Sequence, residues 1–111
     1  MYIEQREIII RIGIISLQGR LDEEGADQLT KALEQQSERG INSLLVDLHR
    51  VNFIDSAGVA ALVGGMKQLR AKGGDLRLIG LQPGPRSIFE LMALDKVFTI
   101  FETEAEALLG L

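Results

Sequence analysis

The sequence contains no cysteine and no tryptophan, and its single histidine is His49. Without cysteine, neither a disulfide nor a thiolate metal site can form. A single imidazole also disfavours a histidine-based zinc site and a Ser–His catalytic pair. We therefore expect no metal site, no cofactor and no catalytic residue in this chain.

Basic residues and long hydrophobic runs are also scarce. The chain has 12 Lys and Arg against 16 Asp and Glu, a net charge of −4, and no basic cluster. Nucleic-acid binding needs a positive surface, so we expect no direct nucleic-acid partner. The longest uncharged run, residues 56–66, is far shorter than the roughly 20 residues that cross a membrane. Because charged side chains occur from Glu4 to Glu7, the N-terminus does not resemble a signal peptide, and we expect a cytoplasmic protein without membrane association.

The composition that remains is that of an ordinary folded domain. Hydrophobic residues make up 46% of the 111 residues and charged residues 25%. A chain of this length buries roughly two thirds of the surface that its unfolded form exposes. No internal repeat, low-complexity tract or linker interrupts it, so we expect a single domain over residues 1–111.

Strand and helix patterns alternate along the chain. β-Branched residues predict strands over 7–12 and 14–17, with a tight turn or bulge at Gly13 between them. Alternating strands and helices imply parallel pairing, and the opening hairpin adds antiparallel strands. We therefore predict an α/β fold with a mixed sheet of four to six strands. The other expected elements are helices over 23–39, about 55–72, 86–94 and 104–109, and strands over 43–48, 76–81 and 97–101.

Apolar spacing also predicts which helical side chains are buried. The 23–39 helix should bury Ala26, Leu29 and Leu33. The two C-terminal helices should bury Ile88, Leu91 and Met92, and Ala105, Leu108 and Leu109, respectively.

The helix after residue 54 has an unusual surface. Ser56 is a good candidate for its N-cap, and Asp55 places a negative charge at the positive end of the helix dipole. One side carries the apolar residues Val59, Leu62, Val63, Met66 and Leu69, whereas the opposite side carries Ala57, Ala60, Ala61, Gly64, Gly65 and Ala71. Each glycine costs about 1 kcal/mol relative to alanine within a helix, so a compensating contact is expected. Either a partner approaches this small-residue face closely, or other helices of the domain cover it. A partner and the domain's own helices could also each cover part of the face.

The run from Asp47 to Gly58, DLHRVNFIDSAG, together with the upstream Gly19-Arg20-Leu21-Asp22, resembles the STAS domain of anti-sigma factor antagonists. The resemblance covers essentially the whole chain. In that family a partner kinase phosphorylates the serine of a D-S-x-G motif at a helix N-terminus. The resemblance therefore implies a STAS fold, with helices mainly on one side of the sheet, and phosphorylation at Ser56. Ala57 stands where the family often has a second Ser or Thr, which removes a possible second acceptor.

The resemblance also implies a function. The unphosphorylated protein would bind an anti-sigma factor with serine kinase activity, release a sigma factor, and be switched off by phosphorylation of Ser56. The expected partner-binding residues are Asp22, Asn52, Phe53, Asp55, Ser56, Ala57, Gly58, Ala60, Ala61 and Gly64.

Other readings of these residues stay open. Asp22 is also a natural helix cap, Phe53 is either a core residue or an exposed anchor, and His49 is expected to be an exposed loop residue. An alternative within the family is a STAS subunit of a transporter or stressosome-like assembly that binds partners without a phosphorylation cycle. An enzyme with Ser56 as nucleophile fits poorly, because the sequence has no G-x-S-x-G motif and no base beside that serine.

Overall fold

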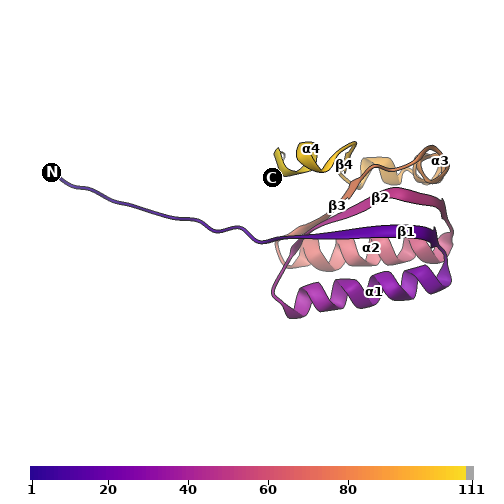
Figure 1. Ribbon diagram of the computed structural model, residues 1–111, viewed down its shortest axis with the longest axis horizontal. Helices are drawn as coiled ribbons and strands as arrows, with labels where there is room; N and C mark the ends of the chain where they lie inside the picture. Colours follow the sequence, from indigo (N-terminus) through magenta and orange to yellow (C-terminus); the bar gives the residue numbers. More distant parts are fainter. Residues whose placement is uncertain (110–111) are drawn as a thin grey trace.

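The computed structural model describes residues 1–109 and shows an α/β domain built on one parallel sheet (Figure 1). Four strands lie in the order of the sequence: β1 (Ile12–Leu21), β2 (Ser43–Ile54), β3 (Asp75–Ile79) and β4 (Ile100–Phe101). All three neighbouring pairs are parallel. The helices are α1 (Glu23–Glu38), α2 (Ser56–Ala71), α3 (Pro83–Leu91) and α4 (Glu104–Leu109), with a short 3₁₀ helix, η1 (Leu94–Lys96), before β4.

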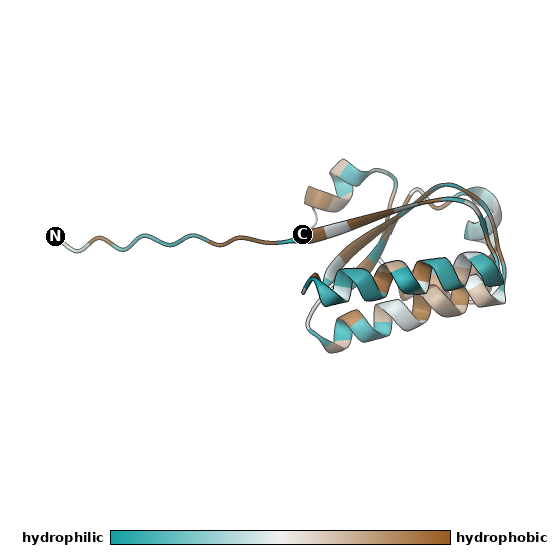
Figure 2. Cartoon of the chain, turned by 60° about the horizontal axis from the view of Figure 1, so that its bottom comes forward, coloured by the Kyte–Doolittle hydropathy of each residue, from teal (hydrophilic) through white to brown (hydrophobic). Residues whose placement is uncertain are grey.

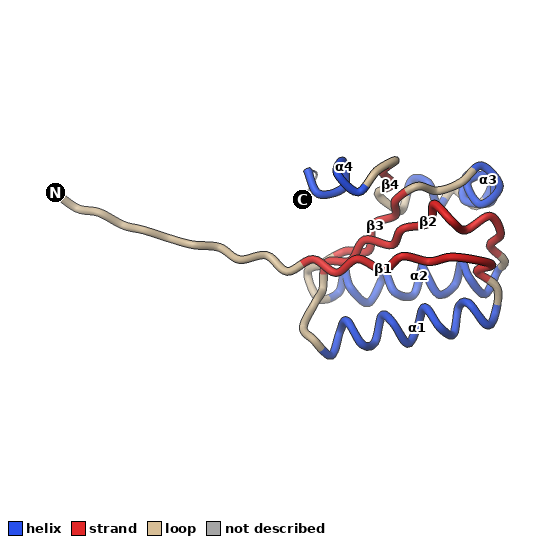
Figure 3. Tube along the Cα trace, viewed as in Figure 1, coloured by secondary structure: helices blue, strands red, loops and turns tan. Residues whose placement is uncertain are grey.

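The predicted N-terminal hairpin does not form. Residues 1–11 carry no strand and extend away from the domain in line with β1 (Figures 1 and 3). Gly13 cannot act as the turn, because it is buried within β1 and a Cβ atom there would lie 2.4 Å from Leu44 Cδ2. A reversal needs at least about two loop residues, and residues 7–12 contain no Gly, Pro, Asn or Asp. The four strands fall within the predicted four to six, but the sheet of residues 1–109 is parallel and not mixed.

The core lies mainly on the side of the sheet that α1 and α2 cover. Side chains alternate along each strand, so Leu44, Val46 and Leu48 of β2 face the larger core, whereas Leu45 faces the smaller one. Phe89 of α3 joins the larger core, and α4 covers the other face through Ala107 (Figure 1). The expectation that the helices pack mainly on one side of the sheet is therefore confirmed. Within residues 1–109, no helix is long and apolar enough to span a membrane.

The last two α-helices bury residues that differ in part from those predicted, although Ile88 of α3 is half-buried against the core as expected. Helix α3 begins at Pro83, because proline is favoured in the first turn of a helix, and Phe89 becomes its central core residue. Leu91 and Met92 are 87% and 53% exposed, so their predicted burial is wrong. In α4 the small Ala107 contacts the sheet, which leaves Ala105, Leu108 and Leu109 exposed and that prediction wrong as well. The predicted core residues of α1 are buried, apart from Leu33, which is half-buried.

β2 continues well beyond the predicted end at residue 48. Its outer half, residues 49–54, pairs with the end of β1 through Arg50↔Gln18, Phe53↔Arg20 and Ile54↔Leu21. The polar residues of this half resemble a loop in the sequence, but the neighbouring strand holds them in the sheet. This extension carries the chain to the edge where α1 and α2 both begin.

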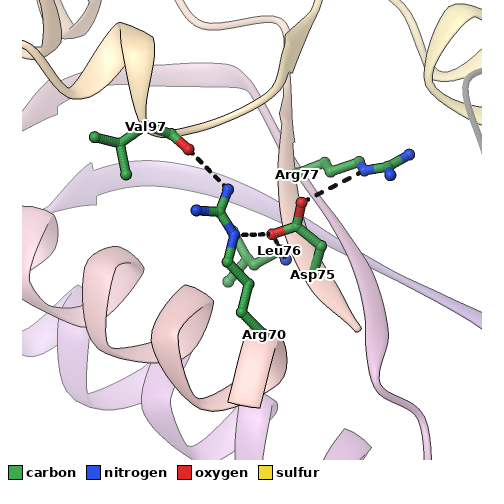
Figure 4. Close-up of polar contacts among 5 residues, drawn as sticks. All are labelled: Arg70, Asp75, Leu76, Arg77 and Val97. Atoms are coloured by element: carbon green, nitrogen blue, oxygen red, sulfur yellow. Dashed lines mark hydrogen bonds and ion pairs between the residues drawn. The ribbon is translucent and has the colours of Figure 1, made fainter. Parts of the chain in front are cut away.

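Arg70 connects three parts of the fold near the end of α2 (Figure 4). Its Nε lies 2.8 Å from Asp75 Oδ1 at the start of β3, and its Nη2 donates to the Val97 carbonyl at 2.7 Å. The other carboxylate oxygen of Asp75 lies 3.7 Å from Arg77 Nε. This ionic network fixes the end of α2 against β3 and against the segment that leads to β4.

Candidate functional site

Two helices begin side by side where β1 and β2 end. Leu21 and Ile54 are paired in the sheet, and each is followed by an aspartate that caps a helix. Asp22 Oδ1 accepts a hydrogen bond from the Gly25 N–H at 3.0 Å, and Asp55 Oδ1 accepts one from the Gly58 N–H at 3.0 Å. The Asp55 N–H also donates to the Leu21 carbonyl at 3.2 Å, which ties the two strand ends together.

Ser56 is the first residue of α2 and not its N-cap, so the capping prediction is wrong for this residue. Asp55 takes that position with an extended backbone, φ −107° and ψ −173°. Ser56 is exposed, and its hydroxyl makes no hydrogen bond to another residue within 1–109. The hydroxyl is therefore available to solvent and is not needed to begin the helix.

The predicted site residues did not include Gly25, which has the same position in α1 as Gly58 has in α2. A Cβ at Gly58 would lie 2.3 Å from the Leu21 carbonyl oxygen, and a Cβ at Gly25 would lie 2.6 Å from the Arg20 carbonyl oxygen. Glycine thus lets each helix pass close to the backbone of β1. The signal for this was visible in the sequence as a repeated D-x-x-G pattern, DEEG at 22–25 and DSAG at 55–58.

The surface beside Ser56 is acidic. An open depression there is lined by Asp22, Glu23, Glu24, Asp27 and Asp55. These carboxylates do not form a metal site: within residues 1–109, no three His, Asp or Glu side chains are grouped to hold a metal ion.

Arg20 and Phe53 form a pair next to the acidic depression. The guanidinium carbon of Arg20 lies 3.7 Å from the centroid of the Phe53 ring, and Arg20 Nε lies 3.9 Å from Asp22 Oδ2. Phe53 is 37% exposed, so it lies outside the core. Of the two expectations for Phe53, a core residue or an exposed anchor for a partner, its exposure is compatible with the second.

The small-residue face of α2 is covered in part by α1. Gly65 is buried, and a Cβ there would lie 2.7 Å from Leu33 Cδ1 of α1. Ala57 and Ala61 are half-buried, whereas Ala60 and Gly64 are exposed. In Figure 2 much of the α2 ribbon is pale, beside the largely hydrophilic, teal ribbon of α1. The groove between the helices is lined by Thr30, Leu33, Glu34, Ala60, Ala61, Gly64, Gly65 and Gln68.

One row of residues connects the serine with this groove. Ser56, Ala60 and Gly64 follow one another at a spacing of four, which places them on one side of a helix, and all three are exposed. Asn52 is also exposed but lies earlier, in β2. His49 is exposed as expected, although it lies in β2 and not in a loop, with its Nδ1 2.7 Å from Asp47 Oδ1.

Comparison with known proteins identifies this arrangement. A model of the STAS domain family matches residues 4–107. The chain belongs to the STAS domain family. The anti-sigma-B factor antagonist of Listeria monocytogenes is 34% identical to this STAS domain over 93 residues, which cover 83% of this chain and 81% of that protein.

Solved structures agree with this assignment. An anti-sigma factor antagonist from Mycobacterium paratuberculosis has a TM-score of 0.80 and 26% identity, over 94% of this chain and 88% of that one. Unphosphorylated SpoIIAA, an anti-sigma factor antagonist, has a TM-score of 0.77 and 25% identity, over 93% and 90% of the two chains. The phosphorylated form of the Bacillus cell fate determinant SpoIIAA has a TM-score of 0.71 and 26% identity, over 93% of each chain. The predicted family and the predicted STAS fold are confirmed.

Proposed function

We propose that this STAS domain is an anti-sigma factor antagonist whose binding to an anti-sigma factor with serine kinase activity ends when Ser56 is phosphorylated. The observation that carries the proposal is the exposed Ser56 hydroxyl at the N-terminus of α2, which has no hydrogen-bond partner within residues 1–109. The names of its relatives support the antagonist role, and the phosphorylated form of SpoIIAA supports a phosphorylation step.

Ser56 is a substrate in this proposal, and the partner supplies the chemistry. The Ser56 oxygen would form a bond to the γ-phosphorus of ATP as the bond from that phosphorus to ADP breaks. The hydroxyl proton would pass to a base of the kinase. Because Asp55 and not Ser56 caps α2, the modification would break no hydrogen bond that begins the helix.

The charge of the phosphate explains how one modification could end binding without unfolding the domain. At a helix N-terminus a phosphate gains about 0.3–1 kcal/mol from the dipole and the free N–H groups. Enclosing a group of about −1.5 to −2 charge in an interface beside the carboxylates of Asp22 and Asp55 should cost several kcal/mol. The second effect is larger, so the phosphorylated protein should remain folded and lose its partner.

The proposed docking surface has two parts. The first is the edge formed by Asp22, Asp55 and Ser56 with the Arg20–Phe53 pair and Asn52, and the second is the row from Ser56 through Ala60 to Gly64, flanked by Ala57, Gly58 and Ala61. The acidic part favours a basic partner surface. The small residues allow the partner to approach the backbone of α2 closely.

Phosphate mapping tests the acceptor. With its partner kinase and ATP, the protein should gain one phosphate at Ser56, and Ser56→Ala should gain none. Ser87→Ala is the matched control, because Ser87 is also exposed and near the start of a helix, but its hydroxyl donates to the Pro83 carbonyl at 3.0 Å. Equal phosphorylation of Ser56→Ala and the wild type would contradict the assignment. Tight binding without phosphate transfer would instead favour a non-cycling STAS interaction module.

A phosphate mimic tests the switch. Ser56→Asp should melt at the wild-type temperature and bind the anti-sigma factor at least about tenfold more weakly, a change of about 1.4 kcal/mol. Isothermal titration calorimetry and a melting curve on the same preparation measure both effects. If stability and affinity fall together, Ser56 has a structural role and the switch is not supported.

A further inference from the structure

The N-terminal segment, residues 1–11, exposes an unusual run of apolar residues. Ile8, Ile9 and Ile10 are 82%, 79% and 69% exposed, and Figure 2 shows the brown, hydrophobic stretch immediately before β1. The segment is extended and contains no proline or glycine. Such a segment has the side chains and the backbone conformation of a β-strand that has no partner.

The outer edge of β1 is the matching surface. In the sheet of residues 1–109, β1 is a terminal strand and pairs only with β2. Ile14 of β1 is 41% exposed. The segment does not lie along this edge within its own chain, because it runs straight into β1 without a turn (Figure 3).

We propose that a second copy of this chain pairs with it here, each N-terminal segment lying antiparallel along the outer edge of the other copy's β1. Residues 3–12 of one copy match the length of the other copy's β1, which has 10 residues. A two-fold arrangement is self-complementary, since every copy carries both the segment and the free edge. The two exchanged strands would join the two sheets into one continuous sheet.

The side chains select one register, with the two-fold axis at Ile12. Side chains that lie opposite each other on antiparallel strands must point to the same face of the sheet. The two strands can therefore change register only in steps of two residues. In the chosen register Ile9 lies opposite Ile15 of the other copy, and Ile10 lies opposite Ile14. The next register in either direction would place Glu7 or Arg11 beside Ile15, which is only 8% exposed and belongs to the core.

This interface would extend along β1 to the edge where α1 and α2 begin. With the two-fold axis at Ile12, the other copy's Glu4 would lie opposite Arg20 and its Ile3 opposite Leu21, at the carboxyl end of β1, next to which α2 begins (Figure 1). Association of the chain with itself can be measured without the anti-sigma factor and without phosphate, so its test is independent of the proposed function.

Sedimentation equilibrium of the full chain tests the association. We expect a mass twice that of the chain, with a dissociation constant in the micromolar range or tighter, and Ile9→Lys should be monomeric. Leu91→Lys is the matched control, because Leu91 of α3 is as exposed as Ile9, at 87% against 79%, and lies away from the segment. Circular dichroism should show that both variants are folded, since neither side chain is in the core.

Cross-linking tests the register in a chain without native cysteine. Ile12→Cys places two thiols opposite each other on the axis and should form an interchain disulfide on oxidation. Ile8→Cys is the control, because the two thiols would be about 27 Å apart along the strands and should not react. A monomer at about 100 µM would overturn the proposal, as would a dimer that persists in Ile9→Lys. Equal cross-linking of the two cysteine variants would overturn the register.

Discussion

Asp55 and Ser56 are neighbours with different roles in the structure. Asp55→Ala should lower the free energy of unfolding by about 1 kcal/mol, because it removes the acceptor for the Gly58 N–H. Ser56→Ala should change it by less than about 0.5 kcal/mol, because the Ser56 hydroxyl has no partner within residues 1–109. Urea denaturation of both variants measures the difference. An equal loss in the two variants would show that Ser56 also contributes to the cap.

Two glycines of α2 should respond to alanine in opposite directions. At Gly58 the new Cβ would lie 2.3 Å from the Leu21 carbonyl oxygen and 2.8 Å from Leu21 Cγ, so the helix must shift, and we expect a loss of about 1–3 kcal/mol. At Gly64, apart from the two neighbouring residues and the nearby backbone of α2, no atom lies within 4 Å of the new Cβ, so the higher helix propensity of alanine should stabilise the protein by up to about 1 kcal/mol. Thermal melts of the two variants make the comparison, and a destabilised Gly64→Ala would contradict it.

At the residue scale, the sequence identified the position of the exposed serine but not the division of roles around it. Ser and Asp are nearly equal as helix caps, and the sequence does not show which of two neighbours adopts the extended backbone of an N-cap. Phe53 was ambiguous for a similar reason. Its burial depends on how β2 pairs with β1, which brings Arg20 over the ring.

At the element scale, the alternation of strands and helices predicted the α/β fold and its parallel pairing correctly. The errors arose where tertiary contacts decide the outcome. Pairing with β1 extends β2 through its polar outer half, residues 49–54, and the start of α3 at Pro83 makes Phe89 the core residue. The hairpin at Gly13 was wrong for a local reason, since one residue cannot reverse the chain.

The exposed row on α2 can be tested with one matched pair of variants. Ala60→Glu should change stability by less than about 0.5 kcal/mol, because Ala60 is exposed, but it should weaken binding to the anti-sigma factor by placing a longer, charged side chain in the proposed interface. Ala71→Glu makes the same change at the exposed end of α2 and should leave affinity unchanged. A melting curve and a binding titration measure both quantities, and equal affinities for the two variants would reject the docking row.

At the scale of the whole molecule, α2 connects two regions with different tasks. Its first residue, Ser56, lies at the proposed binding edge, whereas Arg70 lies about 21 Å further along the axis, in the ionic network with Asp75 and Val97 (Figure 4). This network joins α2 to β3 and to the segment before β4, so it stabilises the connection between elements that are distant in the sequence. Stability and binding should therefore be separable along a single helix.

Arg70→Ala should lower the free energy of unfolding by about 1 kcal/mol, because it removes the ion pair to Asp75 and the hydrogen bond to the Val97 carbonyl. The estimate is modest because the Arg70 side chain is 40% exposed and solvent screens the pair. The loss from Arg70→Ala together with Asp75→Ala should be smaller than the sum of the two single losses, since the residues share one contact. Affinity for the anti-sigma factor should be unchanged in Arg70→Ala, the reverse of Ala60→Glu. If Arg70→Ala weakens binding while the domain remains folded, the docking surface reaches the far end of α2 and must be redrawn.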